Sequence, residues 1–244
     1  MLHYRQGYAY GENAIVIDFP QGLSSALSNL ATLGSYSAER HYQREKISFY
    51  GRAFDDLIRE SKELHPPEQS IHDFFLSKFT SPDGPTDGIS AKKFGGRPSY
   101  LKLLSQPGLF GERKYDSQGR KYINQATRVK LLQRIDKRWL KHKVGIMQNV
   151  LRAKFMLPPF KEILLSTHDY PIYVHNRGGA NIWNKSPCKL RRRTIGDREV
   201  TKWGLLGDLL MEIREQLEIE QRKRHRNSLY ISEIFLVLAV KKQN

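Results

Sequence analysis

Apolar positions three and four residues apart recur through much of the chain, most clearly between Ala126 and Phe155. This spacing places the apolar side chains on one face of a helix, so it predicts one long helix that ends before Pro158-Pro159. The segment WGLLGDLLMEIREQLEIEQRKRH, from Trp203 to His225, predicts a second long amphipathic helix. Shorter helices are predicted from a cap at Ser35 or Ser37 to Tyr50, from Asp55 to Lys62, from Ile71 to Phe79, and within FKEILLST.

Strands are predicted in three short segments. These are AIVIDF (Ala14 to Phe19), PIYVHN (Pro171 to Asn176) and SLYISEIFLVLAV (Ser228 to Val240). The longest apolar run of the chain, Ile234 to Val240, is interpreted as a buried final strand. Because helix outweighs strand in this pattern, the sequence predicts a mainly α fold with a few short strands, of the α+β class.

The size and composition fit an intracellular globular protein. A chain of 244 residues with 39% hydrophobic residues can bury a core as one large domain, or as one domain with insertions. No apolar run approaches the roughly 20 residues that cross a bilayer, and the first residues lack the apolar segment of a signal peptide. The single cysteine, Cys188, excludes an internal disulfide and fits a reducing compartment. We therefore expect a cytoplasmic protein that does not enter a membrane.

The formal net charge of +16 is the compositional feature that says most about partners. Such a charge attracts polyanions, and each phosphate that a protein neutralises adds a salt-dependent increment to binding. The basic residues are densest in KLRRRT (Lys189 to Thr194) and in QRKRHR (Gln221 to Arg226). The predicted partners are nucleic acid, a nucleotide or an acidic surface. The alternative is a charge that serves solubility alone.

Motifs of several common catalytic classes are absent from the sequence. The chain contains no P-loop, no paired CxxC and no HExxH, which argues against a P-loop NTPase, a zinc finger and a zincin. Its eight histidines are dispersed, so we expect no metal site. Cys188 lies beside a basic run that could lower its pKa, but without a histidine partner we interpret it as an ordinary loop cysteine.

One carboxylate stands apart from the others, Glu39 in the stretch YSAERHYQREK (Tyr36 to Lys46). Most acidic residues lie in predicted helices beside Lys or Arg, where solvated ion pairs are the default. Glu39 instead follows the turn-rich apolar segment LSNLATLGSYSA, where the N-terminus of a helix would open towards a pocket. Tyr42, Lys46 and Phe49 follow it at spacings of three and four residues and share its face. From these residues alone, a catalytic carboxylate and an ordinary charged helix face both remain open.

Six blocks of the chain resemble a known family when they are taken in order. Besides YSAERHYQREK they are VIDF (Val16 to Phe19), ALSNL (Ala26 to Leu30), RWLKHKVGIMQNVLRAKF (Arg138 to Phe155), LLST (Leu164 to Thr167) and LGDLLMEIREQL (Leu206 to Leu217). Their order, and the spacing from Trp139 to Met147 and on to Ala-Lys-Phe, are similar to those of the NADAR family. Members of this family cleave N-glycosidic bonds of ADP-ribose-like or ribosylated-amine substrates. In its Ser-x-Glu-His motif, Arg40 of this chain takes the position of the histidine.

The resemblance implies a mainly helical fold with a cleft for a ribose-linked group, in which Glu39 matches the catalytic glutamate. Breaking an anomeric C–N bond builds positive charge on the ribose. A carboxylate can stabilise that charge, orient the attacking water or take its proton. The residues implied to contact the substrate are Ser28, Asn29, Lys46, Lys154 and Trp183. For Lys154, pairing with Glu39 or a phosphate and packing in the core both remain open. The chemistry requires no metal or cofactor.

The chain departs from the family pattern in its second half. Val174 or His175 stands where the family has a glutamate, and Asn184 stands where a glycine follows the tryptophan. Gly204 occupies the position of an asparagine before the last helix. These departures imply a different substrate, a weakened activity, or binding without turnover.

The remaining segments are interpreted as insertions into one domain over residues 1–220, near 62–88, 98–136 and 185–198, followed by a basic segment and strand over 221–244. The basic loop after Trp183 contributes the residues expected to contact nucleic-acid phosphates, Lys189, Arg191, Arg192 and Arg193. The first hypothesis is an N-glycosidase that removes an ADP-ribose-like group from a nucleobase or nucleotide, within DNA or RNA or free. The second is a non-catalytic protein of the same fold, such as a viral effector, that binds a nucleotide-like ligand or nucleic acid. A small-molecule role in clearing riboflavin-pathway intermediates is a third.

Overall fold

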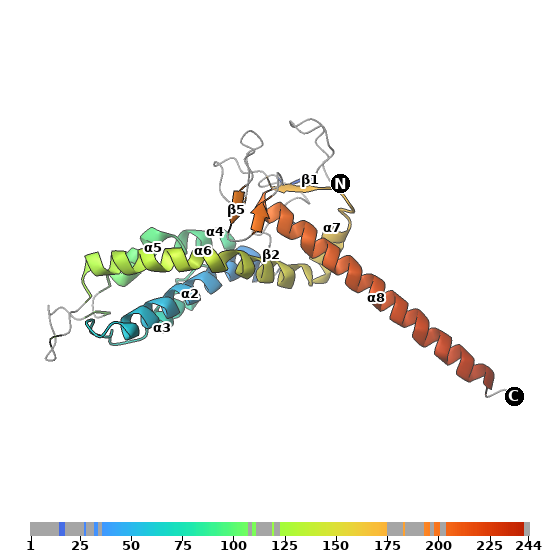
Figure 1. Ribbon diagram of the computed structural model, residues 1–244, viewed down its shortest axis with the longest axis horizontal. Coiled ribbons are helices and arrows are strands. Elements are labelled where there is room, and N and C mark those ends of the chain that lie inside the picture. The colour runs from blue at the N-terminus through green and yellow to red at the C-terminus, as the bar shows by residue number, and fades with distance from the viewer. Residues whose placement is uncertain are drawn as a thin grey trace. The chain divides into compact units, whose positions relative to one another are not determined.

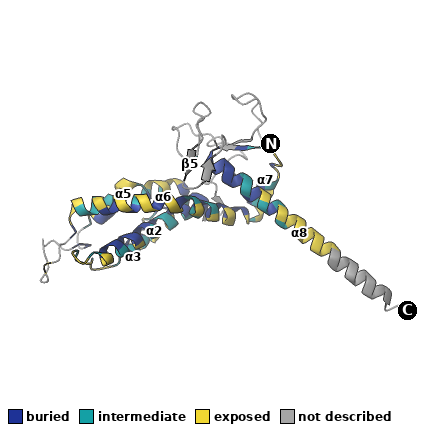
Figure 2. Cartoon of the chain, viewed as in Figure 1, coloured by how far each residue is buried: buried dark blue, intermediate teal, exposed yellow. Residues whose placement is uncertain are grey.

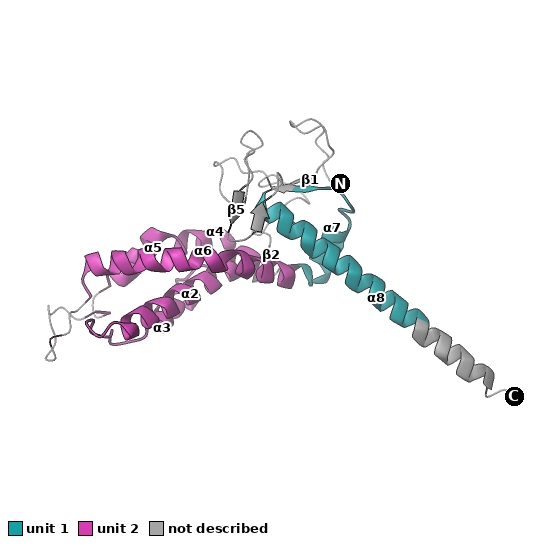
Figure 3. Ribbon diagram, in the orientation of Figure 1, with its two compact units in different colours: residues 1–27, 155–244 teal, residues 28–154 magenta. Residues whose placement is uncertain are grey.

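The computed structural model describes residues 15–17, 27, 32–33, 36–106, 109–110, 119, 123–174, 183, 193–195, 198–200 and 204–241. These residues are mainly helical, as predicted. The chain divides into two compact units, the central unit (Ser28–Lys154) and the terminal unit (Met1–Leu27 with Phe155–Asn244), coloured magenta and teal in Figure 3. Because two compact units can be lobes of one domain, the single domain over residues 1–220 stays a prediction.

In the central unit, the described residues form five helices and one short strand pair, which Figure 1 labels in part. β2 (Thr32–Leu33) pairs antiparallel with β3 (Tyr36–Ser37), with Thr32 opposite Ser37 and Leu33 opposite Tyr36. The helices are α2 (Ala38–Glu60), α3 (Ile71–Thr80), α4 (Gly88–Phe94), α5 (Arg97–Leu104) and α6 (Gln125–Phe155). The long helix predicted between Ala126 and Phe155 is confirmed by α6.

α2 is one continuous helix, where the sequence predicts two helices separated near Gly51. The hydroxyl of Ser37 caps its N-terminus by accepting a bond from the backbone N–H of Arg40 at 3.4 Å. Gly51 does not break the helix, because its missing side chain makes room for α3. A Cβ at this position would lie 2.4 Å from the Cα of His72. Gly51 is therefore the point on α2 where α3 approaches.

The N-terminus of α3 is held by a carboxylate of α2. Asp55 accepts hydrogen bonds from the hydroxyl of Ser70 at 2.7 Å and from the backbone N–H groups of Ile71 at 2.8 Å and His72 at 3.1 Å. A carboxylate is favourable there because the first N–H groups of a helix have no partner within it.

Two short helices, α4 and α5, form in a part of the chain for which the sequence pattern predicts no helix. The side chain of Asp87 accepts a bond from the backbone N–H of Ser90 at 2.7 Å, and the hydroxyl of Ser90 returns to the backbone N–H of Asp87 at 3.2 Å. This capping box starts α4. Pro98 lies in the first turn of α5, where a missing N–H costs nothing.

Aromatic side chains pack α2 against α5 and α6 in the core of the central unit. Trp139 of α6 has its ring centroid 5.7 Å from that of Tyr42 and 5.3 Å from that of Phe49. Tyr50 stacks on Tyr100 of α5 at 4.6 Å, and its hydroxyl donates to the carboxylate of Asp136 at 2.6 Å. Burying several large rings in one layer supplies much of the apolar stabilisation of this unit.

The described residues of the terminal unit include short strand pairs and the helices α7 and α8. β1 (Ile15–Ile17) runs parallel to β4 (Ile172–Val174), with Val16 opposite Tyr173, and β5 (Arg193–Ile195) pairs antiparallel with β6 (Arg198–Val200). The helices are α7 (Pro158–Leu165) and α8 (Leu205–Lys241). The guanidinium of Arg214 on α8 is buried and donates to the hydroxyl of Thr167 and the carbonyl of Tyr170, both at 2.8 Å, which fixes α8 to the turn after α7.

The predicted strand from Ser228 to Val240 is wrong, because α8 continues as a helix to Lys241. A continuous apolar run such as Ile234 to Val240 has no period that separates strand from helix. No glycine or proline stands between Leu217 and Lys241 to end the helix already under way. The basic stretch Gln221 to Arg226 lies on this helix, and all of its residues are exposed (yellow in Figure 2). Within the described part of the chain, no helix combines the length and apolar character needed to cross a membrane.

Candidate functional site

The predicted site residues are distributed over both units, and some lie outside the described residues. Ser28, Asn29, Lys189, Arg191 and Arg192 are outside them, and Arg193 begins β5 with its backbone alone described. Trp183 belongs to the terminal unit, whereas Glu39, Lys46 and Lys154 belong to the central unit. The predicted convergence of these residues on one pocket therefore stays a prediction, and the central unit supplies the geometry around Glu39.

Glu39 lies in the first turn of α2 and is buried, with 6% of its surface exposed. Its Oε1 accepts a hydrogen bond from Nε2 of Gln43, one helical turn further on, at 2.7 Å. Glu39 thus does not point to bulk solvent, as a residue of an ordinary charged helix face would. Arg44, on the other side of the helix, is exposed, as expected for a residue of a solvated helix face.

Burial raises the pKa of the Glu39 carboxyl above its usual 4.5. Three smaller influences oppose this rise: the hydrogen bond from Gln43, and the positive charges of Lys92 on α4 and of Lys46. The balance leaves a carboxyl that holds its proton more tightly than it would in water. Such a group can give or take a proton closer to neutral pH than an ordinary glutamate can.

Lys46 points to the same side of α2 as Glu39. Its Nζ donates to the carbonyl of Gly95 at 2.7 Å and lies 5.5 Å and 5.6 Å from the ring centroids of Tyr50 and Tyr100. Burial lowers the pKa of Lys46, the carboxylates of Asp136 and Glu39 oppose this, and the charge of Lys143 adds to it. Among the predicted substrate contacts, Lys46 is coupled electrostatically to Glu39.

Gln43 connects Glu39 to the turn between α4 and α5. Its Oε1 is buried and accepts no hydrogen bond from any described residue. Gly95 lies directly against this amide, because a Cβ at position 95 would lie 1.9 Å from the Oε1 of Gln43. Gly95 has a φ of −76°, so the position requires glycine for space and not for backbone conformation. We call Glu39, Gln43, Lys46 and Gly95 the Glu39 cluster.

Tyr42 completes the inward face of this part of α2. Burial raises the pKa of its hydroxyl strongly, and the charge of Glu39 adds to the rise. Its ring packs against Trp139, which is itself 6% exposed. Glu39, Tyr42 and Lys46 therefore share one face, as their spacing predicts. Arg40 is not simply a solvated residue of the helix face, because its Nε donates to the carbonyl of Pro85 at 2.9 Å.

Lys154 is fully buried near the C-terminal end of α6. Burial lowers the pKa of its amine from 10.5 to about 7. An amine with this pKa is part neutral and part charged at physiological pH. Its complete burial fits the core interpretation of Lys154 better than contact with a phosphate from solvent.

In the terminal unit, Trp183 is half-buried and its carbonyl accepts a hydrogen bond from the backbone N–H of Leu206 at 3.2 Å. Gly204 directly precedes α8 and has a φ of +81°. This left-handed conformation favours glycine, and asparagine tolerates it better than most other residues do. The departure at Gly204 therefore has a backbone explanation that is independent of substrate binding.

Gln43, Lys92 and Gly95 are the members of this environment that the sequence interpretation leaves out. Gln43 could have been found from its spacing, since it lies four residues after Glu39 on the same predicted helix. Lys92 and Gly95 carry no comparable signal, because only the packing of α4 on α2 brings them to Glu39.

The described residues contain no group of three His, Cys, Asp or Glu side chains placed to hold a metal ion. The Glu39 cluster offers the chemistry of a buried carboxyl beside an amide and an ammonium group. Comparison with protein-family models, with curated proteins and with solved structures gives no match, so the resemblance to the NADAR family stays a prediction from its motifs.

Proposed function

We propose that the chain is an N-glycosidase that hydrolyses the bond between an ADP-ribose-like group and a nucleobase or nucleotide, with Glu39 as its catalytic carboxylate. The observation that carries the proposal is the burial of this carboxyl at the start of α2, together with its raised pKa. Carboxyls perturbed in this way concentrate where proton transfer is the task. The proposal includes one NADAR-like α+β domain over residues 1–220 in an intracellular protein.

In the proposed reaction the C–N bond at the anomeric carbon breaks, and its electron pair leaves with the nitrogen of the base. Water adds its oxygen to the anomeric carbon and loses a proton to Glu39, which passes this proton to the leaving nitrogen and so becomes a carboxylate again. The negative carboxylate also stabilises the positive charge that develops on the ribose. Ser28 and Asn29 would position the ribose and Trp183 would line the pocket, as the resemblance implies. Gln43 is a positioning residue, because it holds Oε1 of the carboxyl at 2.7 Å.

The proposal is tested by a hydrolysis assay on ADP-ribosylated DNA, ADP-ribosylated RNA and free ADP-ribosylated nucleotides. Glu39→Gln keeps the size of the side chain and removes its charge, so we expect turnover to fall by about 10² or more. The matched control is Glu45→Gln on the same helix, where the carboxylate forms only an outer ion pair with Arg44 at 3.8 Å. We expect this control to retain turnover. Equal turnover by Glu39→Gln and the wild-type chain would remove Glu39 from the mechanism.

A second candidate is a protein that binds a nucleotide-like ligand without turnover. The observation that favours it is the departure from the family pattern at Val174 or His175, which stands where the family has a glutamate. Calorimetry with ADP-ribose distinguishes the two candidates. Binding together with hydrolysis of a linked base supports the enzyme, whereas binding of the same affinity without any product supports the second candidate.

A further inference from the structure

Exposed cations follow one face of α6. The helix carries nine Lys or Arg residues and one carboxylate, Asp136. Six of the nine are exposed, and five of these recur along one face, each three or four residues from another: Lys130, Arg134, Lys137, Arg138 and Lys141. This spacing places them on one side of the helix over about 16 Å of its length. We call these five residues the α6 cation stripe.

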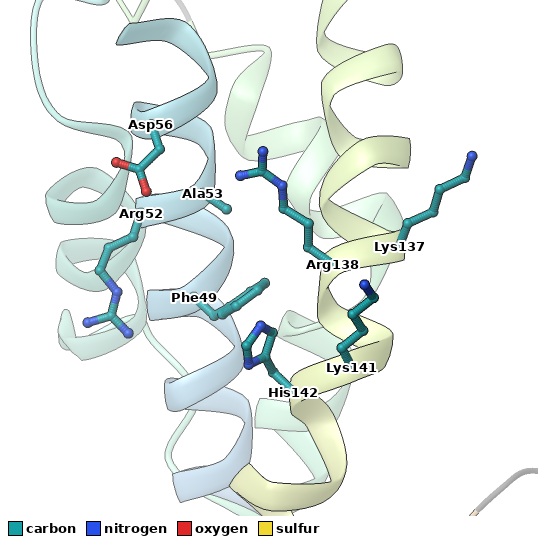
Figure 4. Close-up of a pocket in the computed structure, with 8 residues that line it drawn as sticks. All are labelled: Phe49, Arg52, Ala53, Asp56, Lys137, Arg138, Lys141 and His142. Carbon is teal, nitrogen blue, oxygen red and sulfur yellow. The ribbon is translucent and has the colours of Figure 1, made fainter. Parts of the chain in front are cut away.

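One end of the α6 cation stripe borders a groove between α6 and α2, both in the central unit (Figure 4). The groove has a volume of about 560 Å³. Its lining consists of Phe49, Arg52, Ala53, Asp56, Lys137, Arg138, Lys141 and His142. A groove of this size can hold a ligand and not only a single ion.

Large rings explain why the two helices leave this space. Phe49 of α2 points towards α6, and its ring centroid lies 5.1 Å from that of His142 and 5.3 Å from that of Trp139 (Figure 4). Phe49 and Ala53 supply the apolar part of the groove lining. The cations of the lining come from both helices, Arg52 from α2 and the other three from α6.

The positive charge of the groove is largely uncompensated. Four lining residues are permanent cations and one is a carboxylate, Asp56, which already pairs with Arg59 at 3.0 Å. Arg138 lies 3.8 Å from Glu60, and both side chains are well exposed, so this pair is weak. Among the described residues, no ion pair or hydrogen bond engages Arg52, Lys137 or Lys141. Three cations are thus available for an external anion.

We propose that this groove and the α6 cation stripe form a binding site for the phosphate backbone of a nucleic-acid strand. Lys130 and Arg134 continue the row of charge beyond the groove, and a row about 16 Å long exceeds the reach of one phosphate. It matches a polymer that carries one phosphate per nucleotide. Lys and Arg contacts of this kind position the strand and read no base sequence. The site is independent of the proposed glycosidase activity, because it uses none of the residues of the Glu39 cluster.

The first test measures binding of a fluorescein-labelled oligonucleotide without ADP-ribose by anisotropy, over a series of salt concentrations. The variant Lys137→Gln/Lys141→Gln removes two charges from the site. The control Lys78→Gln/Lys102→Gln removes two charges from exposed positions of α3 and α5 that do not line the groove. We expect the site variant to bind several-fold more weakly, with a slope of log K against log salt that is smaller by about 1.4 to 1.8. We expect the control to change the slope by less than half as much. Equal losses in the two variants would overturn the proposal.

A second test uses the wild-type chain and does not depend on the folding of any variant. Lysine acetylation is followed by mass spectrometry with and without the oligonucleotide. We expect protection of Lys137 and Lys141 and little protection of Lys78 and Lys102. Uniform protection would overturn the site. Equal protection by poly-glutamate at the same concentration of charge would overturn its assignment to nucleic acid.

The anisotropy measurement repeated with Glu39→Gln separates this site from the proposed active site, because we expect that variant to retain binding of the oligonucleotide.

Discussion

At the scale of the residue, the pKa of the Glu39 carboxyl depends on its surroundings in the folded protein. Its pKa in the folded protein lies above the value of 4.5 that it has in an unfolded chain. Between these two values the folded state binds more protons than the unfolded state. The contribution of Glu39 to the free energy of unfolding is therefore fully present below pH 4.5. This contribution is lost as pH rises through the folded pKa of Glu39.

Glu39→Gln removes this titration, so we expect the variant to become more stable than the wild-type chain as pH rises. The difference in free energy of unfolding should grow as pH rises above about 4.5, and it should favour the variant once pH exceeds the folded pKa of Glu39. Urea unfolding at a series of pH values measures it. Glu45→Gln serves as the control on the same helix, and we expect no such trend there. A difference between Glu39→Gln and wild type that does not change with pH would contradict the assignment of a buried, titrating carboxyl.

Gly95 tests the geometry of the Glu39 cluster without touching a charge. In Gly95→Ala the new Cβ would overlap the Oε1 of Gln43, so the amide must leave Glu39 or the turn after α4 must shift. We expect a loss of about 1–3 kcal/mol in the free energy of unfolding. In a Gln43→Ala background the same change should cost much less, because the overlapping group is gone.

The control for this change is Gly145→Ala in α6, where a Cβ would meet no heavy atom within 4 Å. Alanine favours a helix over glycine, so this variant should gain up to about 1 kcal/mol. Urea unfolding compares the wild-type chain with Gly95→Ala, Gln43→Ala, the double variant and Gly145→Ala. Equal costs of Gly95→Ala with and without Gln43 would show that the two residues do not interact.

At the scale of the element, the length of an apolar pattern decided how well it predicted structure. α6 repeats its helical spacing over many turns, and its predicted and observed limits nearly coincide. α2 was divided in the prediction because Gly51 is locally a helix breaker, but the approach of α3 makes glycine suitable there. α4 was missed although Asp87 and Ser90 form a capping box, because that signal stands beside glycines and prolines typical of loops.

The end of α8 gives a prediction at this scale. Leu229 is 53% exposed, so its replacement removes little packing. Leu229→Pro should break the helix there, because proline lacks the N–H and clashes with the preceding turn. We expect a smaller helical signal in circular dichroism, and no loss in Leu229→Ala. If both variants kept the signal of the wild-type chain, residues after Gln221 would not be helical in solution.

At the scale of the whole molecule, composition gives the net charge but not the places where the charges gather. The excess of +16 indicates anionic partners from the sequence alone. The sequence analysis places the densest basic residues at 189–194 and 221–226, because consecutive Lys and Arg residues stand out in a sequence. The α6 cation stripe was missed because its residues are separated in sequence and meet only along a helix face. Its groove further requires α2, whose Arg52 lies far from α6 in the chain.

By itself, the sequence determined that the chain is mainly helical, where α6 lies, and that Glu39 stands near the start of a helix. These properties follow from local hydrogen bonds and from side-chain spacing within one segment. Only the tertiary structure decided that Glu39 is buried, that Gly95 closes on Gln43, and that cations of two helices line one groove. Burial, pKa and grooves depend on distant segments, whose approach leaves no periodic signal in either segment.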